Sequence, residues 1–403
     1  MKEFEERLIQ GMLANGYSLP FAQAIFRQML GFGEYGFPES HAYSFAMLAY
    51  GSSWFKRHEP ACFLAALLNS QPMGFYGPSQ LVQDARRHGV RVLPIDVNHS
   101  EWDCTLEGPL APLQPPRPLP GMRDVAPPQP AVRLGLRLVS GLGQKAAQRV
   151  VQARRSNGSN ESDGSAGLFR STEDLALRAH LDRRDLQALA AADALAALSG
   201  HRRQQMWDAA AQHPVPLLLQ DAPVHEAPLE LPPADEGEEI VFDYAATGLT
   251  LRRHPLALLR PRLERWKLLT ALQLQSTPHG RNVRACGIVT VRQRPGTAKG
   301  TMFVTLEDET GPVNVIVWPA LIERWRDALL RSRLLAVQGM WQCSEQPGIP
   351  AGSASNADAG GEAAAPSSAP VPVVRHLVAQ RFKDLTPLLG RLGGALQGSR
   401  DFH

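Results

Sequence analysis

The chain has few cysteines and no long apolar run, and both absences narrow its class. Its 403 residues include four widely spaced cysteines, Cys62, Cys104, Cys286 and Cys343. The sequence has no Cys-x-x-Cys pair and no cysteine–histidine cluster, so a zinc site and a disulfide framework are excluded. No apolar stretch reaches the roughly 18 residues of a membrane-spanning helix, and the acidic start MKEFEER is not a signal peptide. We therefore expect a cytoplasmic protein with reduced thiols.

Strong net charge and a metal-binding carboxylate motif are also lacking. The formal net charge is +3, so a nucleic-acid partner would need a local basic surface. Two-metal nucleotidyl transfer needs close carboxylates, yet the sequence contains no Asp-x-Asp. The acidic groups that remain are interpreted as helix caps or loop residues (Asp96, Asp103, Asp182, Asp185) and as a solvated junction between a strand and a turn (Glu307-Asp308-Glu309). We predict no catalytic or metal-binding residue in this chain.

What is present favours a multidomain α+β protein. With 44% hydrophobic and 20% charged residues, the composition is that of a soluble globular chain long enough for several cores. Composition shifts and hydrophobic periodicity divide it into six segments. These are a helix-rich segment 1–107, a Pro-rich linker 108–130, a helical segment 131–208, a connector with short helices 209–275, a strand-rich domain 276–385 with a disordered loop 348–372, and a tail 386–403.

A helix start in the first segment is suited to an anion. The stretch 31–57 places Ser40 as the N-cap of a helix that begins at His41, and Lys56 and Arg57 end this helix. Ala42, Phe45, Ala46, Ala49 and Tyr50 recur at a spacing that would hold one face against a core. A hydroxyl, an imidazole and free backbone N–H groups at a helix start can receive a phosphate. The alternative is a capped core helix with an exposed histidine.

A helix-hairpin-helix pattern follows at residues 136–150. Glycines at 141 and 143 permit a tight turn whose N–H groups can hold a DNA phosphate without reading its base. Lys145 and Arg149 would add charge on one helix face. A second unit is expected at 180–198, where Asp193 occupies a position at which glycine is usual and makes phosphate binding doubtful. An ordinary helical hairpin remains the alternative for both units.

The strand-rich domain has the pattern of an oligonucleotide-binding (OB) barrel. Five strands are predicted at 283–291, 301–306, 313–317, 334–341 and 373–379, with a helix at 320–330 between the third and the fourth. The loop after the first strand carries Arg292, Arg294 and Lys299, and Phe303 lies on the next strand. Cations beside an aromatic ring suit single-stranded DNA. A core position for Phe303 is the alternative.

Together these motifs resemble the bacterial C-family DNA polymerases, the family of the replicase alpha subunit. Gly36-Phe37, Ser40-His41, Ala46, Tyr50 and Trp54-Phe55-Lys56 resemble the polymerase fingers in order, and the segment Pro60–Ser70 continues the match. Gln71–Tyr76, Leu81–Arg86 and the ending Ser399–His403 are more similar to the error-prone, translesion branch. Pro38-Glu39 stands where replicative relatives more often have Asn-Lys.

The resemblance implies the C-terminal portion of an error-prone DNA polymerase, a nucleotidyltransferase of DNA repair and translesion synthesis after DNA damage. Segment 1–107 would then be part of the fingers, with Ser40, His41, Lys56 and Arg57 near the incoming dNTP. Primer–template and single-stranded DNA are the implied partners, and the sliding clamp would be reached through a partner of the Y-family type. No cofactor is expected on this chain, and Mg²⁺ would act in the complete polymerase.

In this family the catalytic carboxylates belong to a palm that precedes the fingers, so we expect the chain to be inactive alone. The alternative function is a stand-alone, non-catalytic DNA-binding protein built of helix-hairpin-helix and OB modules.

Overall fold

The computed structural model of the protein describes most of the chain. The described residues are 2–33, 39–74, 76–109, 129–156, 167–212, 229–345, 373–396 and 400–402. Outside them lie Gly36, Phe37 and Pro38, most of the Pro-rich linker, the polar loop around 157–166, part of the acidic connector and the loop 348–372. The chain divides into two compact units, the helices of residues 1–58 and nearly all of the remainder from Glu59 onward.

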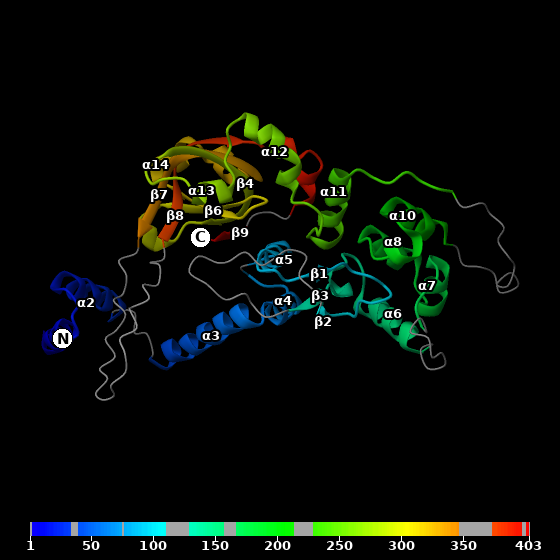
Figure 1. The fold of residues 1–403 in the computed structure, drawn as a ribbon, viewed down its shortest axis with the longest axis horizontal. Helices are drawn as coiled ribbons and strands as arrows, with labels where there is room; N and C mark the ends of the chain where they lie inside the picture. The colour runs from blue at the N-terminus through cyan, green and yellow to red at the C-terminus, as the bar shows by residue number, and fades with distance from the viewer. Residues whose placement is uncertain are drawn as a thin grey trace, which may run out of the picture. The chain divides into compact units, whose positions relative to one another are not determined.

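The first unit consists of three helices, α1 (Lys2–Ala14), α2 (Leu19–Gly33) and α3 (Glu39–His58) (Figure 1). Helices α1 and α2 pack against each other and bury Ala22 and Phe26. The rings of Tyr17 and Phe21 stack with their centroids 5.6 Å apart at the start of α2.

Helix α3 differs from the sequence expectation in two ways. It begins at Glu39, so Ser40 lies inside the first turn and is not its N-cap. The expected core contact is also absent from the described residues, because Phe45 is 57% and Tyr50 75% exposed, and the alanines of the same face are exposed. The helix instead exposes seven large apolar side chains, those of Tyr43, Phe45, Met47, Leu48, Tyr50, Trp54 and Phe55.

The second unit begins with two helices and a small sheet. Helices α4 (Pro60–Asn69) and α5 (Pro78–Arg87) precede a three-stranded sheet of order β1-β3-β2, with β1 at Val92–Leu93, β2 at Thr105–Pro109 and β3 at Pro130–Arg133. Strands β2 and β3 are antiparallel, with Leu106 opposite Val132. The Pro-rich stretch between them therefore joins two strands of one sheet and does not separate two folded bodies. One core runs from α4 through this sheet into the following helices.

Those helices form a compact bundle. After a 3₁₀ turn at Leu136–Leu138 come α6 (Gln144–Ser156), α7 (Thr172–Ala179), α8 (Arg183–Ala191), α9 (Ala196–Ser199) and α10 (Arg202–Ala211). Ser171 caps α7 by accepting the N–H of Asp174, and Asp182 caps α8 by accepting the N–H of Asp185. Leu175, Leu186 and Leu189 are fully buried among these helices.

Three further helices and the end of the chain cover the barrel. Helices α11 (Glu236–Thr247) and α12 (Pro255–Arg265) share a core with the 3₁₀ turn Thr386–Leu389 and with α16 (Leu392–Ala395). Leu389, Leu392 and Leu396 are buried there, so residues 386–396 pack against α11 and α12 and do not form a loose tail. Helix α13 (Ala271–Gln275) inserts Leu274 into the barrel core.

The barrel has the expected five strands and closes on itself. Strands β4 (Asn282–Gln293), β5 (Met302–Glu307), β6 (Pro312–Val317), β7 (Leu334–Glu345) and β8 (Val373–Asp384) follow the order β5-β6-β8-β7-β4, and β4 pairs back to β5. Strand β6 runs parallel to β8. A Cβ at Gly339 would lie 2.0 Å from the carbonyl oxygen of Val378, so glycine permits the close approach of β7 and β8.

Short elements complete the barrel. The expected helix at 320–330 is two helices, α14 (Pro319–Arg324) and α15 (Arg326–Arg331), which meet at Trp325. The loop after β4 contains a 3₁₀ turn at Gly296–Ala298, and β9 (Arg400–Phe402) pairs with β4 in parallel. The fold class expected from the sequence, a multidomain α+β chain with hairpin helices and a five-stranded barrel, is confirmed.

Candidate nucleic-acid interface

The first hairpin exposes the backbone groups that could receive a phosphate. Gly141 has a φ of +86°, in the left-handed region that favours glycine, and both Gly141 and Gly143 are exposed. Among the described residues, neither glycine N–H donates a hydrogen bond to a backbone carbonyl. Leu142 is buried between them, and the N–H of Ser140 donates to the carbonyl oxygen of Ala246 at 2.8 Å. The buried Leu142 side chain and the Ser140–Ala246 hydrogen bond thus hold the turn in place, while Gly141 and Gly143 are exposed to solvent.

The two cations of α6 have different environments. Lys145 is exposed in the first turn of the helix, beside the glycines. Arg149 was expected on the same DNA-facing side, but its Nε donates to the carbonyl oxygen of Ala179 at 2.9 Å and its Nη2 donates to Asp185 at 3.2 Å. Arg149 therefore joins α6 to the second hairpin, while Lys145 is exposed beside the glycine turn.

The turn of the second hairpin carries a carboxylate in place of an open N–H pocket. Asp193 has a φ of +62°, and its carboxylate accepts from Gln205 at 2.6 Å and from Arg252 at 3.0 Å. A fixed negative charge at the turn repels a phosphate. The carboxylate is the physical reason to expect that the second hairpin does not bind a phosphate.

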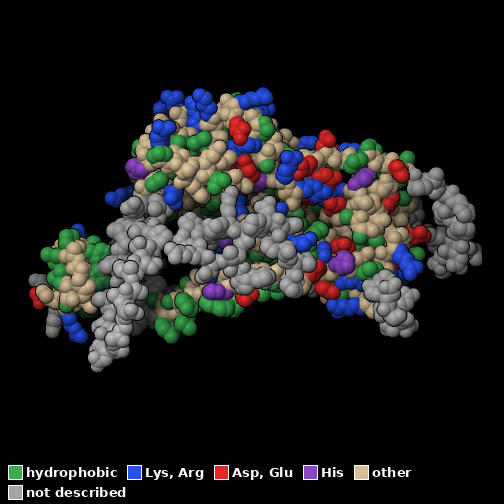
Figure 2. All heavy atoms as spheres, in the orientation of Figure 1, with side chains coloured by type: hydrophobic (Ala, Val, Ile, Leu, Met, Phe, Trp, Pro, Cys, Tyr) green, Lys and Arg blue, Asp and Glu red, His purple; other side chains and the backbone are tan. Residues whose placement is uncertain are grey.

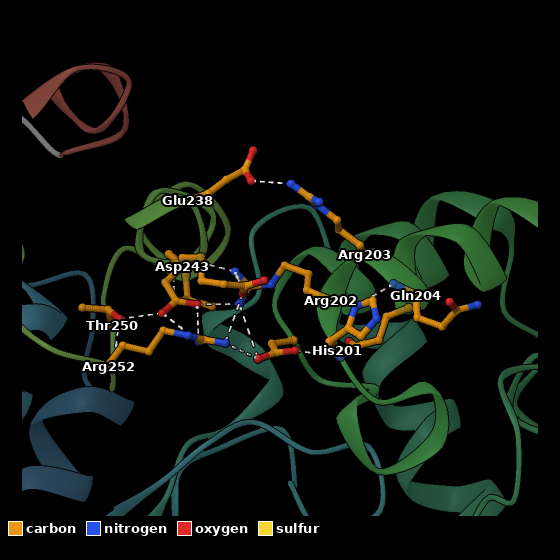
Figure 3. Close-up of polar contacts among 12 residues, drawn as sticks. His201, Arg202, Arg203, Gln204, Glu238, Asp243, Thr250 and Arg252 are labelled. Carbon is orange, nitrogen blue, oxygen red and sulfur yellow. Dashed lines mark hydrogen bonds and ion pairs between the residues drawn. The ribbon is translucent and has the colours of Figure 1, made fainter. Parts of the chain in front are cut away.

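Asp193 pairs with Arg202 and Arg252 and so joins an ionic network that the sequence did not reveal. Figure 3 shows Arg202, Asp243 and Arg252 of this network pointing toward one another. Arg202 of α10, 3% exposed, lies 2.5 Å from Asp243 and 3.0 Å from Glu239 of α11. Asp243 also accepts from Thr250 at 2.5 Å and from Arg252 at 3.2 Å. Burial raises the pKa of Glu239, although Arg202 and Arg252 oppose this. The network fixes the second hairpin to α11.

The acidic run Glu307-Asp308-Glu309 also has a structural role, and its interpretation as a solvated junction was wrong. Asp308 is 1% exposed and accepts from the N–H groups of Ala271, Thr310 and Gly311. Glu307 pairs with Arg87 of α5 at 2.9 Å, and burial raises its pKa. Glu309 pairs with Arg260 of α12 at 2.5 Å. These three carboxylates join the barrel to the helices that cover it.

The barrel loop keeps only part of its expected DNA-binding set. Arg292 is 5% exposed, and its guanidinium donates to the carbonyl oxygens of Leu329 and Ser332 at 2.7 and 2.6 Å. It connects β4 to the end of α15 and cannot reach DNA. Arg294, Lys299 and Phe303 are exposed, so the proposal of a stacking surface keeps these three residues.

The four residues expected near the incoming nucleotide are not brought together. Ser40 and His41 lie in the first turn of α3 and Lys56 and Arg57 in its last turn. Fifteen residues of helix rise by about 22 Å, which is longer than one triphosphate. The ring of His41 packs on Phe45 with centroids 4.4 Å apart.

The described residues offer no place for a resident metal ion. Among them, no three His, Cys, Asp or Glu side chains are grouped as metal ligands. All four cysteines are free thiols, and burial raises the pKa of Cys104 to about 11 and that of Cys286 to about 12. Within the described residues, none of the helices has the length and apolar character needed to cross a membrane.

Comparison with known proteins finds relatives among error-prone DNA polymerases. Residues 89–205 match the family described as helix-hairpin-helix motif. Along its whole length the chain is 52% identical to an error-prone DNA polymerase of Burkholderia pseudomallei, covering 33% of that protein. It is 51% identical to one of Bordetella parapertussis and 50% identical to one of Methylococcus capsulatus, covering 34% and 35% of them. The resemblance to the error-prone branch is confirmed, and the chain spans about a third of the length of these relatives.

Comparison of folds adds little. A crystal structure of asparaginyl-tRNA synthetase from Pyrococcus horikoshii with asparaginyl-adenylate aligns with 29% of this chain and 22% of its own, at 16% identity and a TM-score of 0.21. A likeness this weak carries no argument about function.

Proposed function

We propose that this chain is part of an error-prone DNA polymerase and that it holds primer–template DNA by phosphate contacts. About 50% identity along the whole chain to error-prone DNA polymerases is the observation that carries the proposal. The whole proteins act in damage-induced synthesis and repair on this view, and the present chain supplies DNA-binding modules to that activity.

The first hairpin is the phosphate-binding element of this proposal. The N–H groups of Gly141 and Gly143 point out of a turn that precedes the positive end of α6, a helix of 13 residues. Lys145 adds a mobile cation beside them. Contacts of this kind position a protein on DNA of any sequence, because a phosphate is the same at every base pair. A polymerase that must move along its template needs contacts of this type.

The chemistry of nucleotide addition is assigned to the rest of the complete protein. Among the described residues no carboxylate cluster can hold paired Mg²⁺ ions, so Mg²⁺ is expected to bind elsewhere in the polymerase. The incoming dNTP is expected at the start of α3, near Ser40 and His41. Lys56 and Arg57 lie too far along the helix to contact the same triphosphate.

A sliding clamp is proposed to bind a partner of the Y-family type and not this chain directly. The two stretches most similar to a clamp-binding peptide, Gln204–Trp207 and Leu272–Gln275, are parts of the helices α10 and α13. In the first, Gln205 is fully buried and bonds Asp193 and Gly200. In the second, Gln273 caps its own helix through Thr270, and Leu274 is buried. Neither can extend into a clamp groove without unfolding.

The alternative function, a stand-alone DNA-binding protein, uses the same hairpin and barrel. The DNA next to the gene distinguishes the two proposed functions. An adjoining reading frame with the motifs of a polymerase palm favours the polymerase, and its absence favours the binding protein.

The salt dependence of duplex binding tests the hairpin assignment. Each phosphate contact contributes about 0.9 to the slope of log affinity against log salt for duplex DNA. We expect Lys145→Ala to reduce that slope by about one contact on a labelled primer–template, with no change in preference among sequences. Fluorescence anisotropy of the 403-residue chain at several salt concentrations measures it.

A matched control lies on the same helix. Arg155→Ala removes one charge from the far end of α6, where Arg155 is 69% exposed and pairs with Glu101. This variant should keep the parental slope. Equal slopes for the parent and Lys145→Ala would show that the hairpin is only structural.

A further inference from the structure

A large groove on the outer surface of the barrel has no role in the function proposed above. Its volume is about 1100 Å³, and it is bordered by the start of β4, the middle of β7, the end of β8 and the segment after α12. The loop after β4 and Phe303 do not line it. The groove is therefore separate from the surface on which single-stranded DNA was expected.

The groove is lined by cations without acidic partners. Its lining contains no Asp or Glu. Its basic side chains, all exposed, are Arg265, Lys267, Arg281, Arg284, Arg381 and Lys383. Within the described part of the chain, none of these six forms an ion pair, whereas Arg87, Arg202 and Arg260 of the same unit are all paired. Figure 2 shows Lys and Arg side chains gathered along the upper edge of the barrel. Uncompensated charge of one sign in a groove concentrates a positive potential there.

The strand pattern fixes these side chains on the outer surface. Val283 and Ala285 point into the barrel core, so Arg284 between them points outward. Phe382 is buried, so Arg381 and Lys383 on either side of it point outward as well. Arg284 lies opposite Gln338, another residue that lines the groove. Arg284, Arg381 and Lys383 are therefore held in place by the strands of the barrel, while Arg265, Lys267 and Arg281 lie beside them at the end of α12, in the segment after it and just before β4.

An aromatic ring lies among these cations. Trp266, immediately after α12, lines the groove and is 38% exposed. The Nζ of Lys383 is 5.5 Å from its ring centroid, and the Cζ of Arg262 is 5.3 Å from it. Cation–π contacts hold the indole in position. A positive groove that contains an accessible aromatic ring is the combination that binds single-stranded nucleic acid, since bases stack while phosphates are neutralised.

We propose that this groove binds a single-stranded DNA segment, with phosphates on the six cations and a base against Trp266. The ligand is expected to be single-stranded because the bases of a duplex are stacked inside the double helix and offer no free face to the indole. The choice of DNA over RNA rests on the function proposed above. An uncopied stretch of template strand is a ligand of this kind.

Anisotropy with a fluorescein-labelled oligothymidylate of about 12 nucleotides, a length one such barrel can cover, tests the proposal. Single strands contribute about 0.7 per phosphate to the salt slope. The double variant Arg284→Ala/Lys383→Ala should therefore lower the slope by about 1.4. Trp266→Ala should weaken binding by about five- to a hundred-fold, the range measured for loss of one stacked base, and Trp266→Phe should retain most of the affinity.

Matched controls lie on the same barrel outside the groove. Trp318 is 52% exposed, and the side chain of Arg331 on α15 is 82% exposed; neither lines the groove. Arg326 of the same helix is exposed and also lies outside the groove. Trp318→Ala and Arg326→Ala/Arg331→Ala should bind the oligonucleotide as the parent does. Thermal unfolding of every variant verifies that the barrel is intact, which is expected because the groove residues changed are at the surface.

Three results would overturn the proposal. The first is parental affinity and slope in the groove variants, and the second is loss of all single-strand binding in Arg294→Ala/Lys299→Ala. The third is displacement of the oligonucleotide by an acidic peptide at matched charge, which would indicate a protein ligand. None of these changes the expected effect of Lys145→Ala on duplex binding, so failure of the groove and failure of the proposed function are distinguishable.

Discussion

Arg202 and Arg203 are neighbours in the sequence and differ sharply in environment. Arg202 is 3% exposed and pairs with Glu239 and Asp243, whereas the side chain of Arg203 is 40% exposed and pairs with Glu238 at 2.6 Å. A buried charge that loses its partner stays unsolvated, while a surface charge returns to water. The same residue type at adjacent positions therefore contributes very differently to stability.

We expect Arg202→Ala to lower the free energy of unfolding by about 3 kcal/mol, since it leaves two buried carboxylates with Arg252 as their remaining cation. Arg203→Ala should cost less than about 1 kcal/mol. Urea denaturation followed by circular dichroism compares them. Equal losses for the two variants would mean that the network is no more stabilising than a surface pair.

The sequence predicted the chemical character of a site better than it predicted which way each side chain points. Lys145 is exposed beside the glycine turn, as its pattern indicated. The pairing of Arg202 with Asp243 could not be predicted from the sequence, because the two residues are 41 positions apart and meet only in the fold. The sequence did contain an acidic stretch at 236–243 and arginine pairs on either side of it, and opposite charges of this kind were the available hint.

At the scale of elements, a bulge in β4 explains why Arg292 is buried. Val283, Ala285 and Val289 point into the core at the alternation expected of a strand. The register with β5 shifts between Val289 and Val291. One extra residue reverses the facing of everything after it, so Arg292 points inward. Alternation alone could not predict this, because a bulge has no clear sequence signal here.

The length of α3 decides which end can contact a nucleotide. In the complete polymerase proposed above, we expect His41→Ala to lower kcat/KM for dNTP by about ten- to a hundred-fold, the worth of one charge-assisted hydrogen bond. Lys56→Ala/Arg57→Ala, at the other end of the helix, should leave the KM for dNTP unchanged. Steady-state primer extension measures both.

The variant at each end of α3 serves as the control for the variant at the other end. Similar increases in KM for both variants would show that the four residues act together as the sequence suggested. A change of less than twofold for His41→Ala would leave His41 as a helix-terminus residue only.

At the scale of the whole molecule, the sequence predicted the modules better than their connections. Hairpin helices and a five-stranded barrel were recognisable because their periodicities and glycine turns are local. The pairing of β2 with β3 across the Pro-rich stretch, and the packing of residues 386–396 on α11 and α12, are contacts between distant segments. Composition marked these stretches as linker and tail because it reports nothing about distant partners.

The second unit is held together where α5, α11 and α12 meet the barrel. The ion pairs Arg87–Glu307 and Arg260–Glu309 cross this junction. The hydroxyl oxygen of Tyr244 lies 3.4 Å from that of Ser79, and burial raises the pKa of Tyr244 to about 12. His254 lies at the same junction, buried as the N-cap of α12, where its Nδ1 accepts the N–H of Leu256. Its protonation state therefore bears on the stability of the whole unit.

Burial lowers the pKa of His254 to about 4, with Glu309 opposing the shift and Arg87 and Arg260 adding to it. Because the folded pKa lies below the unfolded value of about 6.5, the unfolded chain binds the proton more readily. Stability from this group is complete above about pH 6.5 and is lost as the pH falls toward 4. The full loss is about 3 kcal/mol, at about 1.4 kcal/mol per pKa unit.

We expect His254→Asn, which keeps a capping side chain, to abolish this part of the pH dependence. Unfolding by urea between pH 7 and pH 4.5 should show a smaller decrease in the variant than in the parent. His180→Asn is the control, since His180 is exposed and has a φ of +48°, a left-handed conformation that asparagine tolerates. It should keep the parental pH dependence. If His254→Asn follows the parental curve as closely as His180→Asn does, acid destabilisation arises from the carboxylates of the junction and not from this imidazole.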